Sequence, residues 1–343
     1  MIKLSFLVPI YNGDRFLDRL FTSLLSQDIP HTEYEIVCVD DCSQDHSVEL
    51  IEQYCKKYPN VRFLQNEVNR KTAYNANLLA ASARGKYMWF LGQDDYVEPN
   101  CLGKLYKRLN DDSLDVLVFN YRHVREDESV LNECKVVTAS ETLTGIEWIK
   151  KQFVDRDYCQ YLLGYTWRAI IRTEFWKENK IRCVEGMIYE DTINLLKAIV
   201  YANAVASIPD MLYHYRINTS SITYKADFVK RGDLIYEFAF VVGQEVETFY
   251  NELKNIDVDL AKNLYLHLQQ RYNNFAFDLI RTPNEYKRVF YQCVKSNRDF
   301  VYSKWHYFNW ESKLLLNRIF GYSLSCVLYC TYKLYKRLTR RQH

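Results

Sequence analysis

The chain has 343 residues, 48% of them hydrophobic, which is enough for one large domain or two moderate ones with real cores. Its 45 lysine and arginine residues nearly balance 43 aspartate and glutamate residues, so the formal net charge is +2. This balance excludes a global electrostatic field that would favour nucleic acid as a partner. The ten cysteines form no C-x-x-C pair, which is typical of a reduced, cytosolic chain rather than of a zinc site.

The first 120 residues alternate between predicted strands and predicted helices. The apolar start contains Pro9 and no signal cleavage site, so it is predicted to be a strand and not a secretory signal. Short apolar runs predict strands at residues 4–9, 35–39, 61–64, 87–91 and 115–121. Apolar residues at helical spacing predict helices at residues 16–25, from about 45, at 72–84 and at 100–109. Repeated βαβ units of this length predict a mostly parallel sheet covered by helices on both faces.

The pattern changes from about residue 140. A helix is predicted at residues 144–154, a strand at 167–172 and a helix opening at Tyr189. A pair of short strands follows at residues 204–208 and 211–216. After Phe228 the chain is aromatic and predicted to be helical.

Polar clusters follow the carboxyl ends of four predicted strands. They lie at residues 9–13, 40–43, 66–70 and 93–95. Each cluster alone could be loop or helix-cap chemistry, and Asp94-Asp95 alone could be an ordinary turn. Ligands of open α/β sheets bind beyond the carboxyl ends of the strands, so the four clusters together predict a binding site.

These motifs resemble those of glycosyltransferase family 2, whose members have a GT-A fold. The resemblance covers about residues 3–225, and its ending is common among bacterial polysaccharide-assembling members. Its markers are residues 7–12, 39–43, 93–95, 189–191, and 213–216 with 220–223. It implies an α/β, Rossmann-like, mixed and mainly parallel sheet flanked by helices. The implied domain spans 1–225, with a nucleotide-sugar-binding half at 1–120 and an acceptor-side half at 121–225, before a helical region at 226–343.

The resemblance also implies a reaction. A sugar would move from a nucleotide-sugar donor, expected to be a UDP-sugar, to a hydroxyl group of a glycan or lipid-linked acceptor, with inversion at the anomeric centre. Such a single displacement needs a base that takes the acceptor's proton. The match to the family motif assigns this role to Asp191. Since Glu190-Asp191 also opens a predicted helix, N-terminal capping is the alternative role.

Donor contacts are implied for the loops after the first strands. The backbone around Pro9 and Asn12 would bind the nucleotide, Tyr11 would lie flat against the base, and Asp41 would accept a hydrogen bond from the base. Family members often carry an arginine where this chain has Tyr74. Arg70 or Lys71 could supply that positive charge to the diphosphate, and a solvated basic loop is an equal alternative.

Asp94 and Asp95 are implied to serve a divalent cation, Mn²⁺ or Mg²⁺, that bridges the donor's diphosphate. Asp95 is the expected direct ligand, and Asp94 would face the donor sugar or ribose. Family members commonly carry an earlier aspartate where this chain has Gly92, which leaves the number of metal contacts open.

Acceptor contacts are expected from Trp167, Tyr189 and Glu190, with core packing as the alternative for the two aromatic rings. A lone histidine such as His214 is more often structural than a metal ligand. Two other functions compete. A sugar nucleotidyltransferase should carry a glycine-rich basic loop after the first strand, and residues 9–14 offer only Gly13. A non-catalytic sugar-binding or scaffolding protein of the same fold is left open by Gly92.

The C-terminal tail, residues 319–343, is a candidate membrane-surface helix. Residues 319–332 carry no charge but are too few to span a bilayer, which takes about 20 residues. A basic stripe follows, made of Lys333, Lys336, Arg337, Arg340 and Arg341. This arrangement predicts a helix lying on an anionic membrane, and a core helix with a solvated basic end is the alternative. The expected location is cytoplasmic, peripheral on the inner face of the cell membrane.

Overall fold

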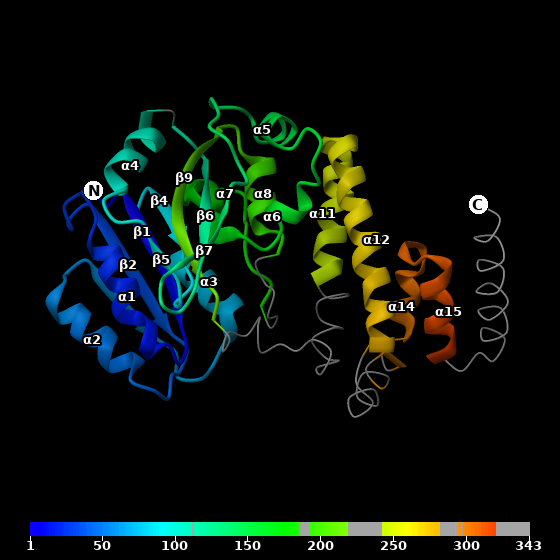
Figure 1. Cartoon of the computed structure of the whole chain (residues 1–343), viewed down its shortest axis with the longest axis horizontal. Coiled ribbons are helices and arrows are strands. Elements are labelled where there is room, and N and C mark those ends of the chain that lie inside the picture. Colours follow the sequence, from blue (N-terminus) through cyan, green and yellow to red (C-terminus); the bar gives the residue numbers. More distant parts are fainter. Residues whose placement is uncertain are drawn as a thin grey trace. The chain divides into compact units, whose positions relative to one another are not determined.

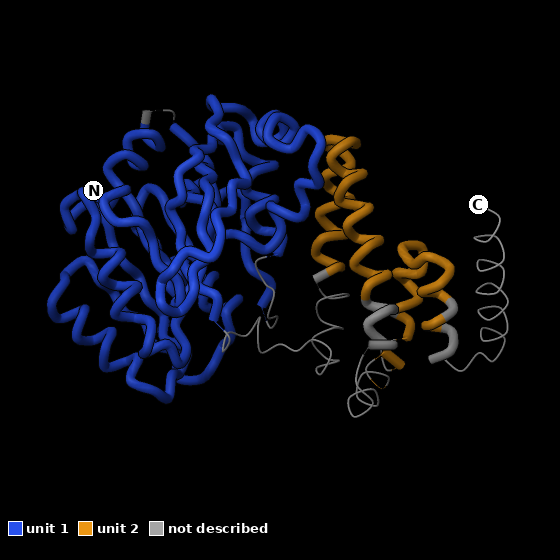
Figure 2. Tube along the Cα trace, in the orientation of Figure 1, with its two compact units in different colours: residues 1–219 blue, residues 220–343 orange. Residues whose placement is uncertain are grey.

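The structure is a computed structural model that describes residues 1–111, 113–185, 192–218, 242–281, 292, 294–295 and 298–319. The chain divides into two compact units, residues 1–219 and 220–343 (Figure 2). The domain boundary predicted at residue 225 lies outside the described residues and stays a prediction.

The first unit is built on a nine-stranded mixed sheet flanked by helices (Figure 1). Its amino-terminal half is parallel, with strands in the order β3-β2-β1-β4. The bounds are β1 Leu4–Ile10, β2 Tyr34–Asp40, β3 Val61–Gln65 and β4 Tyr87–Phe90. The carboxyl ends of these strands therefore meet at one rim of the sheet, as predicted.

The other half of the sheet makes it mixed. Strand β8 (Ala169–Arg172) runs antiparallel to both β4 and β6 (Val116–Val124), and β6 pairs in parallel with β9 (Val205–Arg216). Two short strands complete it, β5 (Tyr96–Val97) against β9 and β7 (Val130–Cys134) against β6. This arrangement confirms the predicted α/β fold with a mixed, mainly parallel sheet.

Helices cover the sheet because their apolar residues recur at helical spacing. In α1 (Asp14–Leu25), the buried residues include Phe16, Leu17, Leu20, Phe21 and Leu24. The remaining helices are α2 Ser47–Lys57, α3 Lys71–Ser82, α4 Leu102–Asp111, α5 Gly145–Gln152, α6 Cys159–Leu162, α7 Thr173–Glu178 and α8 Asn194–Tyr201, with a 3₁₀ turn, η1, at Thr166–Arg168.

Several predicted boundaries were wrong. The strand pair predicted at 204–216 is the single strand β9, and Trp167 lies in η1 and not in a strand. Helix α8 begins at Asn194, after the predicted opening at Tyr189. Pro209 cannot donate to the ladder, and the register of β6 and β9 shifts beside Asn120. The Asn120 side chain donates to the Pro209 carbonyl (3.2 Å), so the strand continues through this irregularity.

The second unit is helical in its described part, as predicted for this region. Its elements are α11 Val242–Ile256, α12 Val258–Arg281, α14 Arg298–Ser303, the 3₁₀ turn η3 Trp305–Tyr307 and α15 Trp310–Ile319. Its packing includes Tyr272 stacked on Tyr307, with ring centroids 5.0 Å apart, and an ion pair between Lys304 and Glu247. Among the described residues, no helix is long and apolar enough to span a bilayer.

Candidate active site

The Gln93 side chain joins the loops that follow β1 and β4. Its Oε1 accepts a hydrogen bond from the Tyr11 backbone N–H (2.7 Å), and its Nε2 donates to the Tyr11 carbonyl (3.0 Å). A Cβ atom at Gly13 would lie 2.7 Å from Gln93 Oε1, so a side chain there would push the Gln93 amide away from Tyr11. The Tyr11 side chain itself stays 44% exposed and presents a flat ring at the rim.

The loops after β1 and β2 are joined around Asn12, which has a φ of 48°. The Asn12 N–H donates to Ser43 Oγ (2.9 Å), and Asn12 Oδ1 accepts from the Gln44 N–H (2.8 Å). Asparagine tolerates this left-handed backbone better than most residues, because its short amide can bond locally. Pro9 lies inside β1, opposite Val39 of β2, one residue before the end of the strand.

Asp41 organises the loop that leads into α3. The side chain is 3% exposed. Its Oδ1 accepts from the Arg70 N–H (2.7 Å) and from Asn66 Nδ2 (2.8 Å), and its Oδ2 accepts from the Lys71 N–H (2.9 Å). Asp41 thus binds backbone donors at the start of α3, where a negative charge is favourable. The Arg70 side chain is exposed and its guanidinium lies 4.2 Å from the centre of the Tyr74 ring.

Asp95 is buried and Asp94 half-buried directly beyond β4. Asp95 is 4% exposed, and its Oδ2 accepts from the Tyr213 hydroxyl (2.6 Å) while its Oδ1 accepts from the Arg216 N–H (2.8 Å). Asn218 Nδ2 approaches Asp94 Oδ2 at 3.3 Å. Burial raises the pKa of Asp94, and burial together with the nearby charge of Asp94 raises the pKa of Asp95 well above its usual range.

Gly92 makes room for this pair. A Cβ atom at Gly92 would lie 2.7 Å from Asp95 Oδ2 and 3.2 Å from Asp94 Oδ1. Its N–H donates to the Tyr213 hydroxyl (2.9 Å), which in turn bonds Asp95. The two carboxylates therefore fill the space that a side chain at position 92 would need.

The donor set at this pair fits a hard divalent cation. No group of three or more histidine, cysteine, aspartate or glutamate side chains that could hold a metal occurs in the described part of the chain. Mg²⁺, however, is typically bound by one or two carboxylates together with the substrate's phosphates. A cation would also offset the burial that raises the pKa of both carboxyl groups and the charge of Asp94 that further raises the pKa of Asp95.

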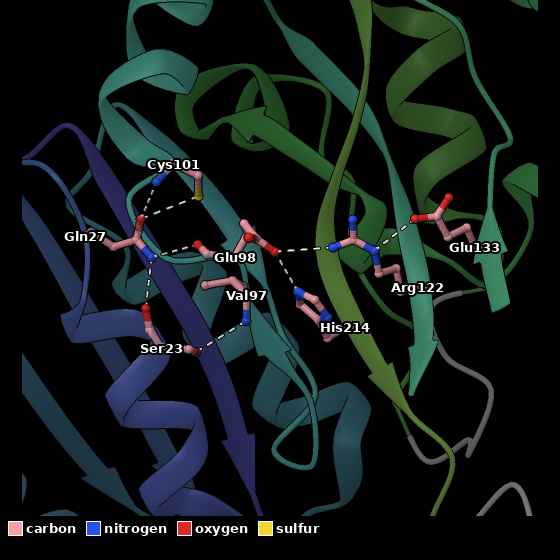
Figure 3. Close-up of polar contacts among 8 residues, drawn as sticks. All are labelled: Ser23, Gln27, Val97, Glu98, Cys101, Arg122, Glu133 and His214. Atoms are coloured by element: carbon pink, nitrogen blue, oxygen red, sulfur yellow. Dashed lines mark hydrogen bonds and ion pairs between the residues drawn. The ribbon is translucent and has the colours of Figure 1, made fainter. Parts of the chain in front are cut away.

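His214 does not join the carboxylate pair. Its Nε2 lies 2.8 Å from Glu98 Oε2, which also receives a long contact from Arg122 (3.5 Å) (Figure 3). Arg122 in turn donates to Glu133. Gln27 binds the same segment from the end of α1, donating to the Glu98 carbonyl (3.1 Å) and accepting from the Cys101 N–H (3.1 Å). This network fixes the chain beyond Asp95.

Trp167 is placed at the same rim by Trp89, whose Nε1 donates to the Trp167 carbonyl (2.8 Å). The other predicted acceptor residues, Tyr189 and Glu190, and the predicted base, Asp191, lie outside the described residues. Thr192, the residue after Asp191, is described, and its carbonyl accepts a hydrogen bond from the Gly164 N–H (2.9 Å).

Sequence reasoning missed how several residues act at the rim. Gln93 stood in a recognised motif, but its bridge to Tyr11 depends on a contact across 82 positions. Tyr213 and Arg216 were recognised as the end of the family pattern, and their bonds to Asp95 were not foreseen. No sequence pattern marks Gln27, because its bonds to Glu98 and Cys101 depend on the packing of α1 against β5.

A family model described as glycosyl transferase family 2 matches residues 5–170. Curated relatives include the poly(ribitol-phosphate) beta-N-acetylglucosaminyltransferase TarS of Staphylococcus aureus, 28% identical over 279 residues, which are 80% of this chain and 46% of TarS. The poly(ribitol-phosphate) beta-glucosyltransferase of Bacillus spizizenii is 26% identical over 290 residues, 82% of this chain and 41% of that protein. The chain thus matches less than half the length of these two relatives.

Solved structures extend the comparison. The crystal structure of S. aureus TarS 1-349 in complex with UDP-GlcNAc matches with a TM-score of 0.65 and 23% identity, over 88% of this chain and 82% of that one. At this identity the likeness shows a common fold. The matched family model, together with the motifs at the ends of β1, β2 and β4, shows that residues 5–170 are similar to glycosyltransferase family 2, and the likeness to TarS shows that the fold is GT-A.

Proposed function

We propose that the chain is an inverting glycosyltransferase that moves a hexose or N-acetylhexosamine from a UDP-sugar to a hydroxyl group of a glycan or lipid-linked acceptor. The proposed setting is bacterial capsule, lipopolysaccharide or exopolysaccharide synthesis. One observation carries the proposal: Gln93 ties the backbone of Tyr11 to the loop that presents Asp94 and Asp95. A flat ring for a base and carboxylates for a diphosphate-bound cation thereby share one rim. The names of the relatives, and TarS crystallised with UDP-GlcNAc and with UDP, support the donor class.

On the donor side, the exposed Tyr11 ring would stack on the base, with the backbone of Pro9 and Asn12 lining the nucleotide. Asp41 would accept from the base N–H while it holds the backbone of Arg70 and Lys71, since each carboxylate oxygen accepts more than one bond. The exposed Arg70 guanidinium would meet the diphosphate.

Asp94 and Asp95 would hold Mn²⁺ or Mg²⁺, which stabilises the negative charge that develops on the departing nucleoside diphosphate. Asp95 would act with both oxygens already fixed by Tyr213 and Arg216, so its orientation is set before the donor arrives. Asp94, which is less buried, would reach the donor sugar or ribose as well as the cation.

Asp191 would take the proton from the acceptor hydroxyl group as that oxygen attacks the anomeric carbon. The bond from this carbon to the diphosphate breaks on the opposite face, which inverts the configuration. Catalysis by such a base contributes about 10² to 10⁴ in rate.

Two experiments test the proposal. Calorimetric titration of the purified chain with UDP-, GDP- and dTDP-sugars should show metal-dependent binding, with UDP-sugars binding best. Binding without Mn²⁺, or no binding of any donor, would contradict it.

The second experiment replaces Asp191 by Asn. Donor affinity should stay within about twofold, while transfer should fall by about 10² to 10⁴. Glu174→Gln, which removes an exposed carboxylate from α7, serves as the matched control and should retain both properties. Retained transfer in Asp191→Asn would remove Asp191 from the role of base.

A further inference from the structure

One face of the β6–β9 pair carries closely packed aromatic side chains. In the parallel register, Tyr121 stands opposite Tyr213 and His123 opposite Tyr215. Alternate residues of a strand point to the same face, so all four side chains share one face. Trp167 lies on them, stacked 4.4 Å from Tyr213 and 5.6 Å from Tyr215 and perpendicular to Tyr121. We call these five residues the aromatic face.

The aromatic face begins beside the carboxylate pair. The Tyr213 ring that stacks on Trp167 carries the hydroxyl group that donates to Asp95 (2.6 Å). The opposite face of the same strands is charged, since Arg122 and His214 contact Glu98 there (Figure 3). The two faces of this ribbon thus have different chemistry, and the aromatic one adjoins the predicted site of sugar transfer.

The outer part of the aromatic face is partly exposed and has polar edges. Tyr213 and Tyr121 are buried, whereas Trp167, His123 and Tyr215 keep intermediate exposure. His123 Nδ1 lies 2.8 Å from Asn132 Oδ1. In the described part of the chain, no group bonds His123 Nε2 or Trp167 Nε1, and neither atom is buried. Flat rings with donors at their edges can stack on the C–H face of a pyranose and hydrogen-bond its hydroxyl groups.

The charge of this face argues against a polyanionic ligand. Within the described part of the chain, the cation in contact with a ring of this face is Arg168, whose guanidinium lies 5.4 Å from the Tyr121 ring and 5.6 Å from the Tyr165 ring. Arg168 is 1% exposed and donates to the Tyr161 carbonyl (2.6 Å), so it cannot meet a phosphate in solvent without rearrangement. Phosphodiesters are bound by accessible, often bidentate, arginine or by lysine.

We propose that the aromatic face binds the accepting sugar, and that this sugar is an uncharged pyranose ring stacked on Trp167 with His123 at its edge. The proposal rests on the proposed function and narrows its acceptor from glycan in general to a pyranose-ended one. A pyranose acceptor would distinguish this chain from the relatives whose names specify poly(ribitol-phosphate), which is a flexible polyanion without a ring.

The test uses the full chain with Mn²⁺ and UDP, and two acceptor probes, methyl N-acetyl-β-D-glucosaminide and poly(ribitol phosphate). Saturation-transfer NMR should show contact with the ring protons of the glycoside and weaker binding of the polyanion. Trp167→Leu and the milder His123→Ala should each weaken glycoside binding by about threefold to tenfold, the loss expected for one stacking or edge contact. UDP affinity should stay within about twofold.

Glu133→Gln is the matched control, because Glu133 lies on the charged face, bonded to Arg122 (3.3 Å), and is expected to leave glycoside binding unchanged. Circular dichroism melting identifies any variant that has lost its fold. If Trp167→Leu is unfolded, the result with His123→Ala decides the test. Equal glycoside binding in both variants and the unaltered chain, or tighter binding of poly(ribitol phosphate), would overturn the inference. UDP binding without glycoside binding would also overturn it and leave the proposed function standing, whereas loss of UDP-sugar binding in the unaltered chain would defeat the proposed function itself.

Discussion

Gly92 shows how one missing side chain shapes the candidate cation site. Members of the family that the sequence resembles commonly carry an aspartate at this position, so the glycine leaves the number of metal contacts open. In the structure, the oxygens of Asp95 and Asp94 stand 2.7 and 3.2 Å from where a Cβ atom would be. Gly92 does not have a positive φ, so space and not backbone freedom explains the glycine. The departure from the family pattern is therefore compatible with an intact pair of carboxylates.

We predict that Gly92→Ala destabilises the chain. Glycine-to-alanine changes usually stabilise a fold by about 0.4–1 kcal/mol when the backbone and space allow them. Here the methyl group would displace Asp95 from Tyr213, and losing a buried hydrogen bond costs about 1–3 kcal/mol. Urea unfolding should therefore show a net loss of stability, together with weaker metal-dependent donor binding.

A double-mutant cycle provides the control for this change. In an Asp95→Ala background the added methyl group meets no carboxylate at 2.7 Å, so Gly92→Ala should cost much less there. An equal loss of stability in both backgrounds would show that the Asp95 carboxylate is not what Gly92 accommodates.

At the scale of elements, β5 and β9 hold the segment that follows Asp95. His214 of β9 stacks on Tyr96 of β5, with ring centroids 4.4 Å apart, and its Nε2 faces Glu98. Burial lowers the pKa of His214 below its usual value, against the opposing effect of Glu98. Its Nδ1 is buried and bonds no group in the described part of the chain. The folded chain therefore favours neutral His214.

The sign of the pH effect follows from linkage. An unfolded histidine takes up its proton near pH ~6.5, while folded His214 resists protonation to a lower pH. Its contribution to stability is complete above the unfolded pKa of about 6.5 and is lost as the pH falls from there through the lower pKa of folded His214. We predict that His214→Gln, which keeps a donor for Glu98, reduces the loss of stability between pH 7.5 and 5.5.

Urea unfolding of the unaltered chain and of His214→Gln at pH 7.5 and 5.5 measures this effect. Because both proteins keep the other histidines, the contributions of those residues to the pH dependence cancel in the difference. His46→Gln, which alters an exposed histidine paired with Glu49, is the control for a residue outside this network. An unchanged pH dependence in His214→Gln would contradict the role of burial at His214.

The parallel half of the sheet could be predicted because each strand there is a short, continuous apolar run next to an amphipathic helix. Strand β7 could not, since the side chains of residues 130–133 are exposed and carry no apolar pattern. Pro209-Asp210 is typical of a turn and therefore predicts two strands, whereas in the structure the Asn120 side chain of β6 donates to the Pro209 carbonyl and ties this part of β9 to the sheet.

The candidate site, too, could be predicted from the sequence only in part. The motif residues Tyr11, Asp41, Asp94 and Asp95 were expected at one rim, because strand ends of a parallel sheet meet there. What orients them was not predictable from local pattern. The bond from Tyr213 to Asp95 spans 118 positions, and the bond from Asn218 to Asp94 spans 124. Such contacts are set by tertiary packing.

At the scale of the whole molecule, each of the two units has its own buried residues. In the first unit, Trp89 packs against Phe6 and Phe119 beneath the candidate site. In the second, Leu264, Leu268 and Tyr272 of α12 are fully buried. Each unit thus has a core of its own, and the described residues proposed to bind the donor all lie within residues 1–219.

We propose that this further role is attachment to a membrane surface through residues 319–343, of which residues 320–343 lie outside the described part. Each lysine or arginine near an anionic surface contributes about 1 kcal/mol, so the five basic residues of the stripe would hold the chain at low salt. The full chain should sediment with vesicles containing phosphatidylglycerol and not with vesicles of phosphatidylcholine alone. Binding should weaken as salt rises, because the attraction is screened.

Two variants separate the charge of the tail from its apolar segment. Deletion of residues 319–343 should leave the protein in the soluble fraction. Replacing Arg340 and Arg341 by Gln removes about 2 kcal/mol, which corresponds to about 30-fold weaker binding to the anionic vesicles. Lys254→Gln and Lys262→Gln, which change lysines of α11 and α12, are the matched control for loss of charge elsewhere. A full chain that stays soluble with anionic vesicles at low salt would refute attachment through the tail, because both the basic stripe and the apolar segment act most strongly under that condition.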